Sequence, residues 1–384
     1  MAGQLHRTLV EYSESISEPT DTGYLRGYEL ELQSATGERE QQLVFVAVEH
    51  TVPDVPGVLA VPIDGSTELA SVWIYPADPG LPALRLVTDV LSAKATLDGL
   101  GIAAIPTRVS VVSYRPGRRA VVRLDTASQS MFVKVVEPAK AESISERHDL
   151  FRSSGLPVPR ILGWSADGVI AMSGLPGIEA QSVVGRIDDQ AAFLDQVEFV
   201  CSILGAVPAV NTARPSLFRR LDWYVDRLTE TLPDERERIA RAERVISARG
   251  AEGYDFEFTP VTIHGDLHMG QLFVDPADPS VIAGLLDIDT AGTGDPADDA
   301  GAFYAHLVAL AESLAGIDDN ASAGAHRMAE SWRARWRRNL NAGFEARASA
   351  IGATHLLGHA LQPRSADSDA ISRRLLAQAE RLVD

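Results

Sequence analysis

The sequence lacks several features that would point to particular classes of protein. Its single cysteine, Cys201, excludes an internal disulfide framework. The 35 basic residues are outnumbered by 53 acidic ones, which gives a net charge of −18. A chain this acidic repels nucleic-acid phosphates and anionic membrane surfaces, so we expect neither as a partner. No run approaches the roughly 20 apolar residues of a membrane span, and the first residues lack the apolar segment of a signal peptide. We therefore expect a soluble, cytoplasmic protein.

What is present indicates a folded chain of more than one domain. Hydrophobic residues make up 45% and charged residues 23% of the 384 residues, which is ordinary globular usage. In the first hundred residues, segments 41–49 and 69–75 are typical of strands, and 83–100 has the apolar spacing of a helix. We predict an N-terminal, β-rich domain over residues 1–100.

The remaining chain is predicted to form two further domains, 101–175 and 176–384. The first of these is rich in strands and the second is mostly helical, with a β segment at 261–289 that interrupts the helices. The predicted strands are 109–114, 120–124, 131–136 and two within 161–172, and the predicted helices are 139–153, 190–207, 216–231, 234–249, 300–316, 321–348 and 367–383. A β-rich lobe followed by a helical lobe is an α+β architecture with a cleft between the lobes.

The interrupting β segment contains the most informative residues. His264, Asp266 and His268 alternate in a polar loop between apolar segments, which is costly unless the side chains are paired or functional. One interpretation is a zinc-type metal cluster. The other is a phosphotransfer loop, in which Asp266 accepts the proton of the attacking hydroxyl and Gln271, five residues later, binds Mg²⁺ through its amide oxygen. The second interpretation also predicts a metal-binding aspartate after the next strands, and Asp287 lies there. A turn capped by Asp266 would be the purely structural explanation.

Transfer of a phosphoryl group from a nucleotide also requires a cation on the phosphates. The chain has only three lysines, Lys94, Lys134 and Lys140, and none lies in a Walker A motif. Lys134 lies within the apolar strand 131–136, and we predict that it binds the phosphates. Its carboxylate partner is expected on the next helix, where we prefer Glu146 to Glu142.

Three motifs together resemble the aminoglycoside phosphotransferase and choline kinase-like superfamily. They are His264-Gly-Asp-Leu-His-x-Gly-Gln, Leu285-Leu-Asp-Ile-Asp and Gly294-Asp-Pro-Ala-x-Asp299. The segment 114–123 before Lys134 is similar to the nucleotide-covering hairpin of some members, so the resemblance covers about residues 105–310. Gln271, where most members have asparagine, and the extra N-terminal domain are more like the maltokinase and glucosamine kinase branch.

The resemblance implies a protein-kinase-like bilobal fold, preceded here by the extra N-terminal domain, with ATP and Mg²⁺ as cofactors. It implies that Asp266 is the catalytic base, that Gln271 and Asp287 hold Mg²⁺, and that Lys134 orients the phosphates.

The resemblance also implies that a hinge near Ser173 and Leu175 binds the adenine through backbone groups. Asp289 matches a second acidic residue of the sugar-kinase branch, and Asp299 is expected to be structural, for instance by fixing the helix that starts nearby.

The predicted function is transfer of the γ-phosphate to a hydroxyl of a sugar or amino sugar resembling glucosamine or maltose. An aminoglycoside or another amino alcohol is the alternative acceptor, and a non-catalytic nucleotide-binding pseudokinase is the alternative from another class.

Two further pairs of residues at helical spacing have ordinary explanations. Trp332 and Trp336 could support a sugar ring but are more typical of a helix core. His355 and His359 could chelate zinc, but no third ligand lies nearby in the sequence, so we expect no zinc site there.

Overall fold

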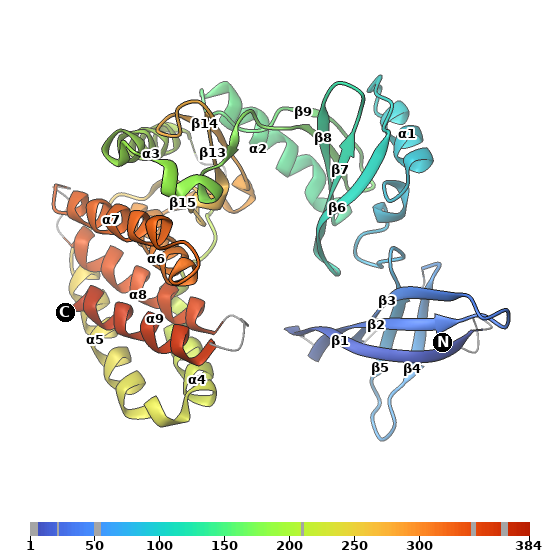
Figure 1. Ribbon diagram of the computed structural model, residues 1–384, viewed down its shortest axis with the longest axis horizontal. Helices are drawn as coiled ribbons and strands as arrows, with labels where there is room; N and C mark the ends of the chain where they lie inside the picture. The colour runs from blue at the N-terminus through green and yellow to red at the C-terminus, as the bar shows by residue number, and fades with distance from the viewer. Residues whose placement is uncertain (1–6, 21–22, 50–54, 209–210, 339–342, 362–367) are drawn as a thin grey trace. The chain divides into compact units, whose positions relative to one another are not determined.

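The computed structural model describes residues 7–20, 23–49, 55–208, 211–338, 343–361 and 368–384 (Figure 1). The chain divides into two compact units. The first consists of Met1–Glu146 and Arg160–Gly174, and the second of Arg147–Pro159 and Leu175–Asp384. The predicted division into three domains stays a prediction. Among the described residues, no helix is both long and apolar enough to cross a membrane.

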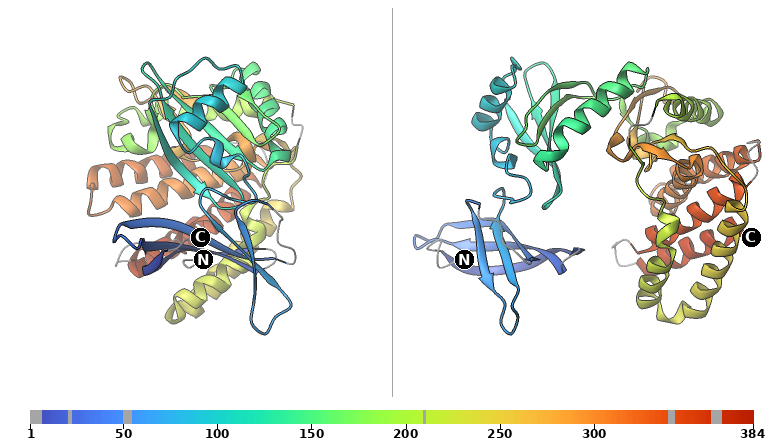
Figure 2. Two further views of the ribbon diagram at one scale, coloured as in Figure 1. Left: turned by 90° about the vertical axis from the view of Figure 1, so that its right-hand side faces the viewer. Right: turned by 180° about the vertical axis from the view of Figure 1, so that it is seen from behind.

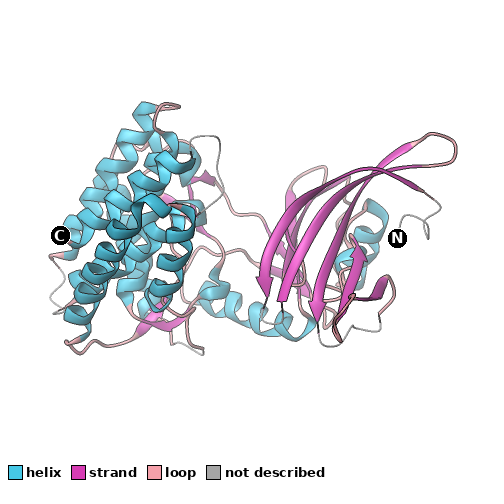
Figure 3. Cartoon of the chain, turned by 90° about the horizontal axis from the view of Figure 1, so that it is seen from below, coloured by secondary structure: helices cyan, strands magenta, loops and turns pink. Residues whose placement is uncertain are grey.

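The first unit begins with an antiparallel sheet (Figure 3). Its strands lie in the order β1-β2-β3-β5-β4, and they are β1 (Thr8–Thr20), β2 (Gly23–Gln33), β3 (Arg39–Glu49), β4 (Val58–Pro62) and β5 (Leu69–Ile74). Phe45 and Trp73 stack in its small apolar core. The predictions for β3 and β5 are confirmed. Strands β1 and β2 were not predicted, because acidic and hydroxyl side chains interrupt their apolar alternation.

The second sheet of this unit has the order β6-β7-β8-β10-β9. Its strands are β6 (Arg108–Arg115), β7 (Arg119–Asp125), β8 (Ser130–Val136), β9 (Ile161–Trp164) and β10 (Val169–Ser173). Helix α1 (Val90–Gly99) contributes Ala93 and Leu97 to the core of this sheet. The predicted helix 83–100 therefore starts later than expected, because the Asp89 side chain accepts hydrogen bonds from the backbone N–H groups of Leu91 and Ser92 and caps the helix at Val90. Helix α2 (Ala141–Ser153) belongs partly to each unit.

The second unit is mostly helical, as predicted (Figure 2). Its helices are α3 (Gln190–Ala206), α4 (Leu221–Thr231), α5 (Arg236–Tyr254), α6 (Pro296–Leu314), α7 (Asp319–Trp336), α8 (Phe344–Ala360) and α9 (Ser368–Val383). The prediction of one helix over 321–348 is wrong, because α7 ends at Trp336 and α8 begins at Phe344. Gly343, directly before α8, has a φ of 79°, which lies outside helical geometry. Residues 339–342 and 367, which were also assigned to helices, lie outside the described residues.

Helix α8 is buried along most of its length, and small residues allow this. A Cβ atom on Gly301 of α6 would lie 2.7 Å from the carbonyl oxygen of Ala348 and 2.8 Å from the nitrogen of Gly352. The two helix backbones thus approach more closely than larger residues would permit. Trp332 and Trp336 of α7 are also buried, at 5% and 3% exposure, and the indole N–H of Trp332 donates to the Ala300 carbonyl at 2.9 Å. Their predicted core role is confirmed.

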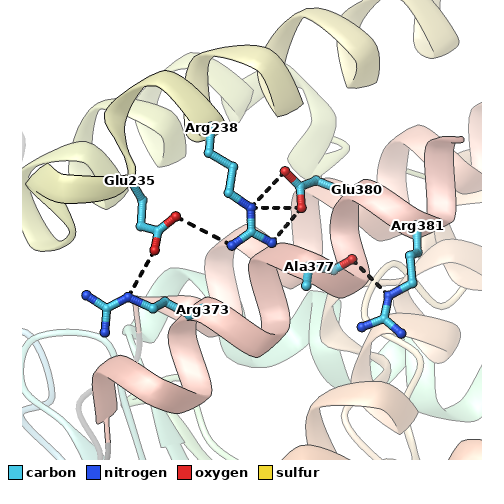
Figure 4. A network of polar contacts seen from close by, with 6 residues as sticks. All are labelled: Glu235, Arg238, Arg373, Ala377, Glu380 and Arg381. Atoms are coloured by element: carbon cyan, nitrogen blue, oxygen red, sulfur yellow. Dashed lines mark hydrogen bonds and ion pairs between the residues drawn. The ribbon is translucent and has the colours of Figure 1, made fainter.

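Ion pairs join α5 to α9 at the surface of the second unit (Figure 4). Arg238 donates from Nη2 to Glu380 at 2.6 Å and from Nε at 2.9 Å, and Arg373 donates to Glu235 at 3.0 Å. These side chains are partly exposed, so each pair adds little free energy. The burial of Leu375, Leu376 and Leu382 in the core is the main contact of the C-terminal helix.

Two small sheets carry the loops of the candidate site. In one, β12 (Val261–Ile263) pairs antiparallel with β15 (Gly292–Gly294). In the other, β13 (Leu272–Val274) lies between β11 (Ile178–Glu179) and β14 (Ile282–Leu285). These strands confirm the predicted β segment within the helical part of the chain.

Candidate active site

Asp299 anchors the start of the loop that carries Asp266. The loop follows β12, and the buried Asp299 carboxylate accepts hydrogen bonds from the backbone N–H groups of His264 at 2.7 Å and Gly265 at 2.8 Å. Burial raises the pKa of Asp299, whereas His264 and the two N–H groups act in the opposite direction. These contacts agree with the expected structural role of Asp299, but it holds the loop and does not cap the nearby helix. Asp295 caps α6 instead, by accepting a hydrogen bond from the N–H of Ala297 at 3.0 Å.

A second set of contacts joins this loop to the one that follows β14. The His264 ring nitrogen Nε2 lies 2.8 Å from the Leu286 carbonyl, and the Thr290 hydroxyl donates to the His264 carbonyl at 2.9 Å. Gly265 has a φ of +80°, and a Cβ atom there would lie 2.8 Å from the Thr290 carbonyl oxygen. The Asp266 and Asp287 loops are consequently held as one assembly.

Asp266 pairs with Arg214, a residue that the sequence did not single out. Arg214 Nη1 lies 3.4 Å from Asp266 Oδ2, with the two side chains 38% and 27% exposed. The backbone N–H of Arg214 donates to the Thr290 carbonyl at 3.0 Å, so the same assembly holds the backbone that carries this side chain. At this exposure the pair contributes little stability, but it orients the carboxylate.

Gln271 and Asp287 are linked through the backbone. The N–H of Leu286, directly before Asp287, donates to the Gln271 carbonyl at 2.8 Å. Asp287 has the left-handed φ of 54°, which is uncommon for a residue other than glycine and often marks functional sites. An amide oxygen and a carboxylate suit Mg²⁺, which also uses substrate phosphates as ligands. Within the described ranges, no three His, Cys, Asp or Glu side chains are grouped so that they could hold a metal ion. A site completed by phosphates fits this donor set.

A cluster of four histidines extends from the same loop. The His268 ring stacks on His306 of α6 with centroids 4.4 Å apart, and His306 lies 4.4 Å from His359 and 6.0 Å from His355, both on α8. Burial lowers the pKa of His268 and His306, and that of His355 to about 3. These three imidazoles are therefore neutral at physiological pH. Only the close packing of α6 and α8 brings the cluster together.

The remaining predicted site residues lie in or next to the first unit. Lys134 is 6% exposed on β8, where its neighbours across the sheet are Val121 and Ile170. Both Glu142 and Glu146 are exposed on α2, and the choice between them as the partner of Lys134 stays a prediction.

The predicted adenine hinge lies where the chain passes between the units. Ser173 ends β10, and its hydroxyl accepts from the backbone N–H of Arg160 at 3.1 Å. Leu175 is the first residue of the longer of the two segments that make up the second unit. The structure thus brings Asp266, Gln271 and Asp287 together in the second unit, while the nucleotide-binding roles of Lys134, Glu146, Ser173 and Leu175 stay predictions.

Asp298 should make the stability of the protein depend on pH. Burial raises its pKa to about 7, Asp295 and Asp299 add to the effect, and Ser216 and Arg219 oppose it. Because this pKa exceeds the unfolded value of about 3.9, the native state binds the extra proton and loses stability as the pH rises from about 4 to 7. We expect Asp298→Asn to raise the free energy of unfolding by about 1–3 kcal/mol more at pH 8 than at pH 4.

Urea unfolding at the two pH values measures this difference. The exposed Asp222→Asn serves as a control that should show no such dependence. An equal effect of Asp298→Asn at both pH values would contradict the prediction, since a lost or gained hydrogen bond alone does not vary with pH.

Comparison with known proteins gives a family match and many solved structures of similar fold, of which two are described below. Residues 114–349 match the Phosphotransferase enzyme family. A thermostable mutant of aminoglycoside phosphotransferase APH(4)-Ia, in a ternary complex with ADP and hygromycin B, has a TM-score of 0.51 at 13% identity, covering 76% of this chain and 97% of its own. The GDP complex of aminoglycoside 2′-phosphotransferase-IIIa has a TM-score of 0.51 at 13% identity, covering 76% of this chain and 99% of its own. No curated protein sequence matches the chain.

Proposed function

Because the chain belongs to the Phosphotransferase enzyme family, we propose that it uses ATP and Mg²⁺ to phosphorylate a hydroxyl group of a small molecule. The predicted superfamily, the α+β kinase-like fold and the enzyme class, a phosphotransferase with an alcohol acceptor, are confirmed. The placement in the maltokinase and glucosamine kinase branch stays a prediction.

The observation that carries the proposal is the assembly of the two acidic loops. Contacts from His264, Thr290 and Leu286 hold the loop of Asp266 against the loop of Asp287. Phosphoryl transfer depends mainly on positioning and on neutralising charge, and such an assembly supplies the positioning.

Each residue then has a specific task. Asp266 accepts the proton of the acceptor hydroxyl. The hydroxyl oxygen forms a bond to the γ-phosphorus of ATP, and the bond between this phosphorus and the oxygen that leaves with ADP breaks. Arg214 orients the Asp266 carboxylate. Gln271 and Asp287 would hold Mg²⁺, which neutralises charge on the phosphates when bound. Lys134 orients the phosphates.

Two classes of acceptor are candidates. Aminoglycosides are favoured by the solved structures of similar fold, one of which contains hygromycin B. The net charge of −18 also suits a cationic acceptor. A neutral sugar is favoured by the histidine cluster, because neutral imidazoles next to the Asp266 loop offer hydrogen-bond donors and acceptors without charge.

ADP release in the presence of different acceptors tests the function and separates the two classes. The panel contains hygromycin B, a second aminoglycoside, glucosamine, glucose and maltose, with Mg²⁺ or EDTA, and with either ATP or GTP as the donor, where release of GDP is measured for GTP. We expect at least one acceptor to raise ADP release well above the acceptor-free rate, and EDTA to abolish the increase. Nucleotide binding without transfer to any acceptor would contradict the proposal and favour the non-catalytic alternative.

A further inference from the structure

A buried carboxylate ties the linker after the first sheet to the tip of the β6–β7 hairpin. Asp78 is 2% exposed, and its Oδ2 accepts hydrogen bonds from the Tyr114 hydroxyl at 2.7 Å and from the backbone N–H of Gly117 at 2.7 Å. Its Oδ1 accepts from the N–H of Gly80 at 2.8 Å. Three donors thus converge on one side chain, and two of them belong to the hairpin. All of these residues lie within the first unit.

The contact between the two segments is also close along the backbone. A Cβ atom on Gly80 would lie 2.7 Å from the carbonyl oxygen and 2.9 Å from the Cα of Gly117. Any other residue at position 80 would push the hairpin tip away. Gly117 itself has a φ of +70°, which suits the tight turn between the two strands.

Aromatic rings extend this contact to the first sheet. The ring of Tyr114 packs edge-on against Phe45 of β3, with centroids 5.4 Å apart, and against Tyr75 at 5.2 Å. Burial and the nearby charge of Asp78 raise the pKa of Tyr114, so its hydroxyl remains a hydrogen-bond donor at physiological pH. The N-terminal sheet therefore packs against the hairpin through Phe45, and the linker after the sheet holds the hairpin through the hydrogen bonds of Asp78.

We propose that the N-terminal sheet and the linker after it act together as a brace that fixes the β6–β7 hairpin for nucleotide binding, with Asp78 of the linker and Tyr114 of the hairpin as the positioning residues. This inference rests on the proposed function and on the resemblance of segment 114–123 to the nucleotide-covering hairpin of related kinases. The turn carries Arg115, Arg118 and Arg119 around the anchored Gly117. Fixing the backbone between these cations before ATP arrives removes part of the ordering cost of binding.

Two variants test the brace in the full-length chain. Tyr114→Phe removes one hydrogen bond and keeps the ring packing, and Asp78→Asn replaces one carboxylate oxygen by a donor while keeping the shape. We expect amide hydrogen exchange at residues 115–119 to become at least about 10-fold faster in Asp78→Asn and less so in Tyr114→Phe. We expect the Kd for ATP with Mg²⁺, measured by calorimetry, to rise about 3- to 10-fold, and kcat at saturating ATP to change less than 2-fold, roughly, because the brace does not touch the acceptor.

Tyr12→Phe is the matched control, since this exposed tyrosine lies on β1 of the same sheet. It should leave both exchange and ATP affinity unchanged. Unchanged exchange in both Asp78→Asn and Tyr114→Phe would overturn the brace itself. Faster exchange with unchanged Kd would overturn its role in nucleotide binding, and tighter ATP binding would show that Asp78 competes with the phosphates instead.

These outcomes are separate from a failure of the proposed function. Hydrogen exchange and calorimetry need no acceptor, so they report on the brace even if the wild-type chain releases no ADP with any acceptor.

Discussion

Asp266→Asn is expected to lower kcat by about 10²–10⁴, the usual loss when a positioned acid–base group is removed. Asparagine keeps the size of the side chain but cannot accept the hydroxyl proton. The contacts that shape the loop come from His264, Gly265 and Thr290, so the loop should keep its structure. The KM for ATP should therefore change little.

The measurement is ADP release with the best acceptor of the panel, together with a thermal unfolding curve. Asp275→Asn, at an exposed position after β13, is the matched control and should retain full turnover. Near-normal kcat in a folded Asp266→Asn protein would remove Asp266 from the reaction and direct attention to another base.

The second large effect concerns the buried ion pair of Arg347 and Asp295. Arg347 is fully buried on α8, and its Nε donates to Asp295 Oδ2 at 2.6 Å. Its Nη1 donates to the Gly253 carbonyl at 3.0 Å, and its guanidinium lies 4.5 Å from the ring centre of Phe258. Arg347→Met should lower the free energy of unfolding by about 3–5 kcal/mol, because it leaves the Asp295 carboxylate buried without its countercharge.

Denaturant unfolding measures this loss. The matched control is Arg227→Met, which breaks an exposed pair with Glu230 and should cost about 1 kcal/mol or less. In the double variant Arg347→Met/Asp295→Asn the uncompensated charge is gone, so part of the stability should return. A loss for Arg347→Met as small as that for Arg227→Met would show that the pair contributes only marginally.

Most regular elements could be predicted from local patterns, and the exceptions have physical causes. Strands β7 and β8 alternate or bury apolar residues and were found. Strands β1 and β2 pair with each other along most of their length, but their side chains are largely polar, so only the pairing itself defines them. The break between α7 and α8 was missed because apolar helical spacing continues on both sides of Gly343.

The residues of the candidate site also fall into two groups, those that the sequence indicates and those that it does not. Asp266, Gln271 and Asp287 could be proposed from the sequence because phosphotransfer chemistry uses such residues at characteristic separations along the chain, and their roles stay predictions. Arg214 and His306 carry no such signal, since each reaches the site from a distant segment. A lone arginine or histidine in a sequence is most often a surface or core residue, so nothing local distinguishes these two.

The sequence by itself determined the family, the mixed α+β fold and the acidic residues of the proposed reaction, because short-range spacing encodes both secondary structure and loop chemistry. Only the tertiary structure decided that Asp299 accepts hydrogen bonds from the loop of Asp266, that four histidines lie beside this loop, and that Asp78 accepts hydrogen bonds from the β6–β7 hairpin. Those contacts join residues separated by about 35 or more positions, and they exist only once burial has brought the segments together and excluded water from between them.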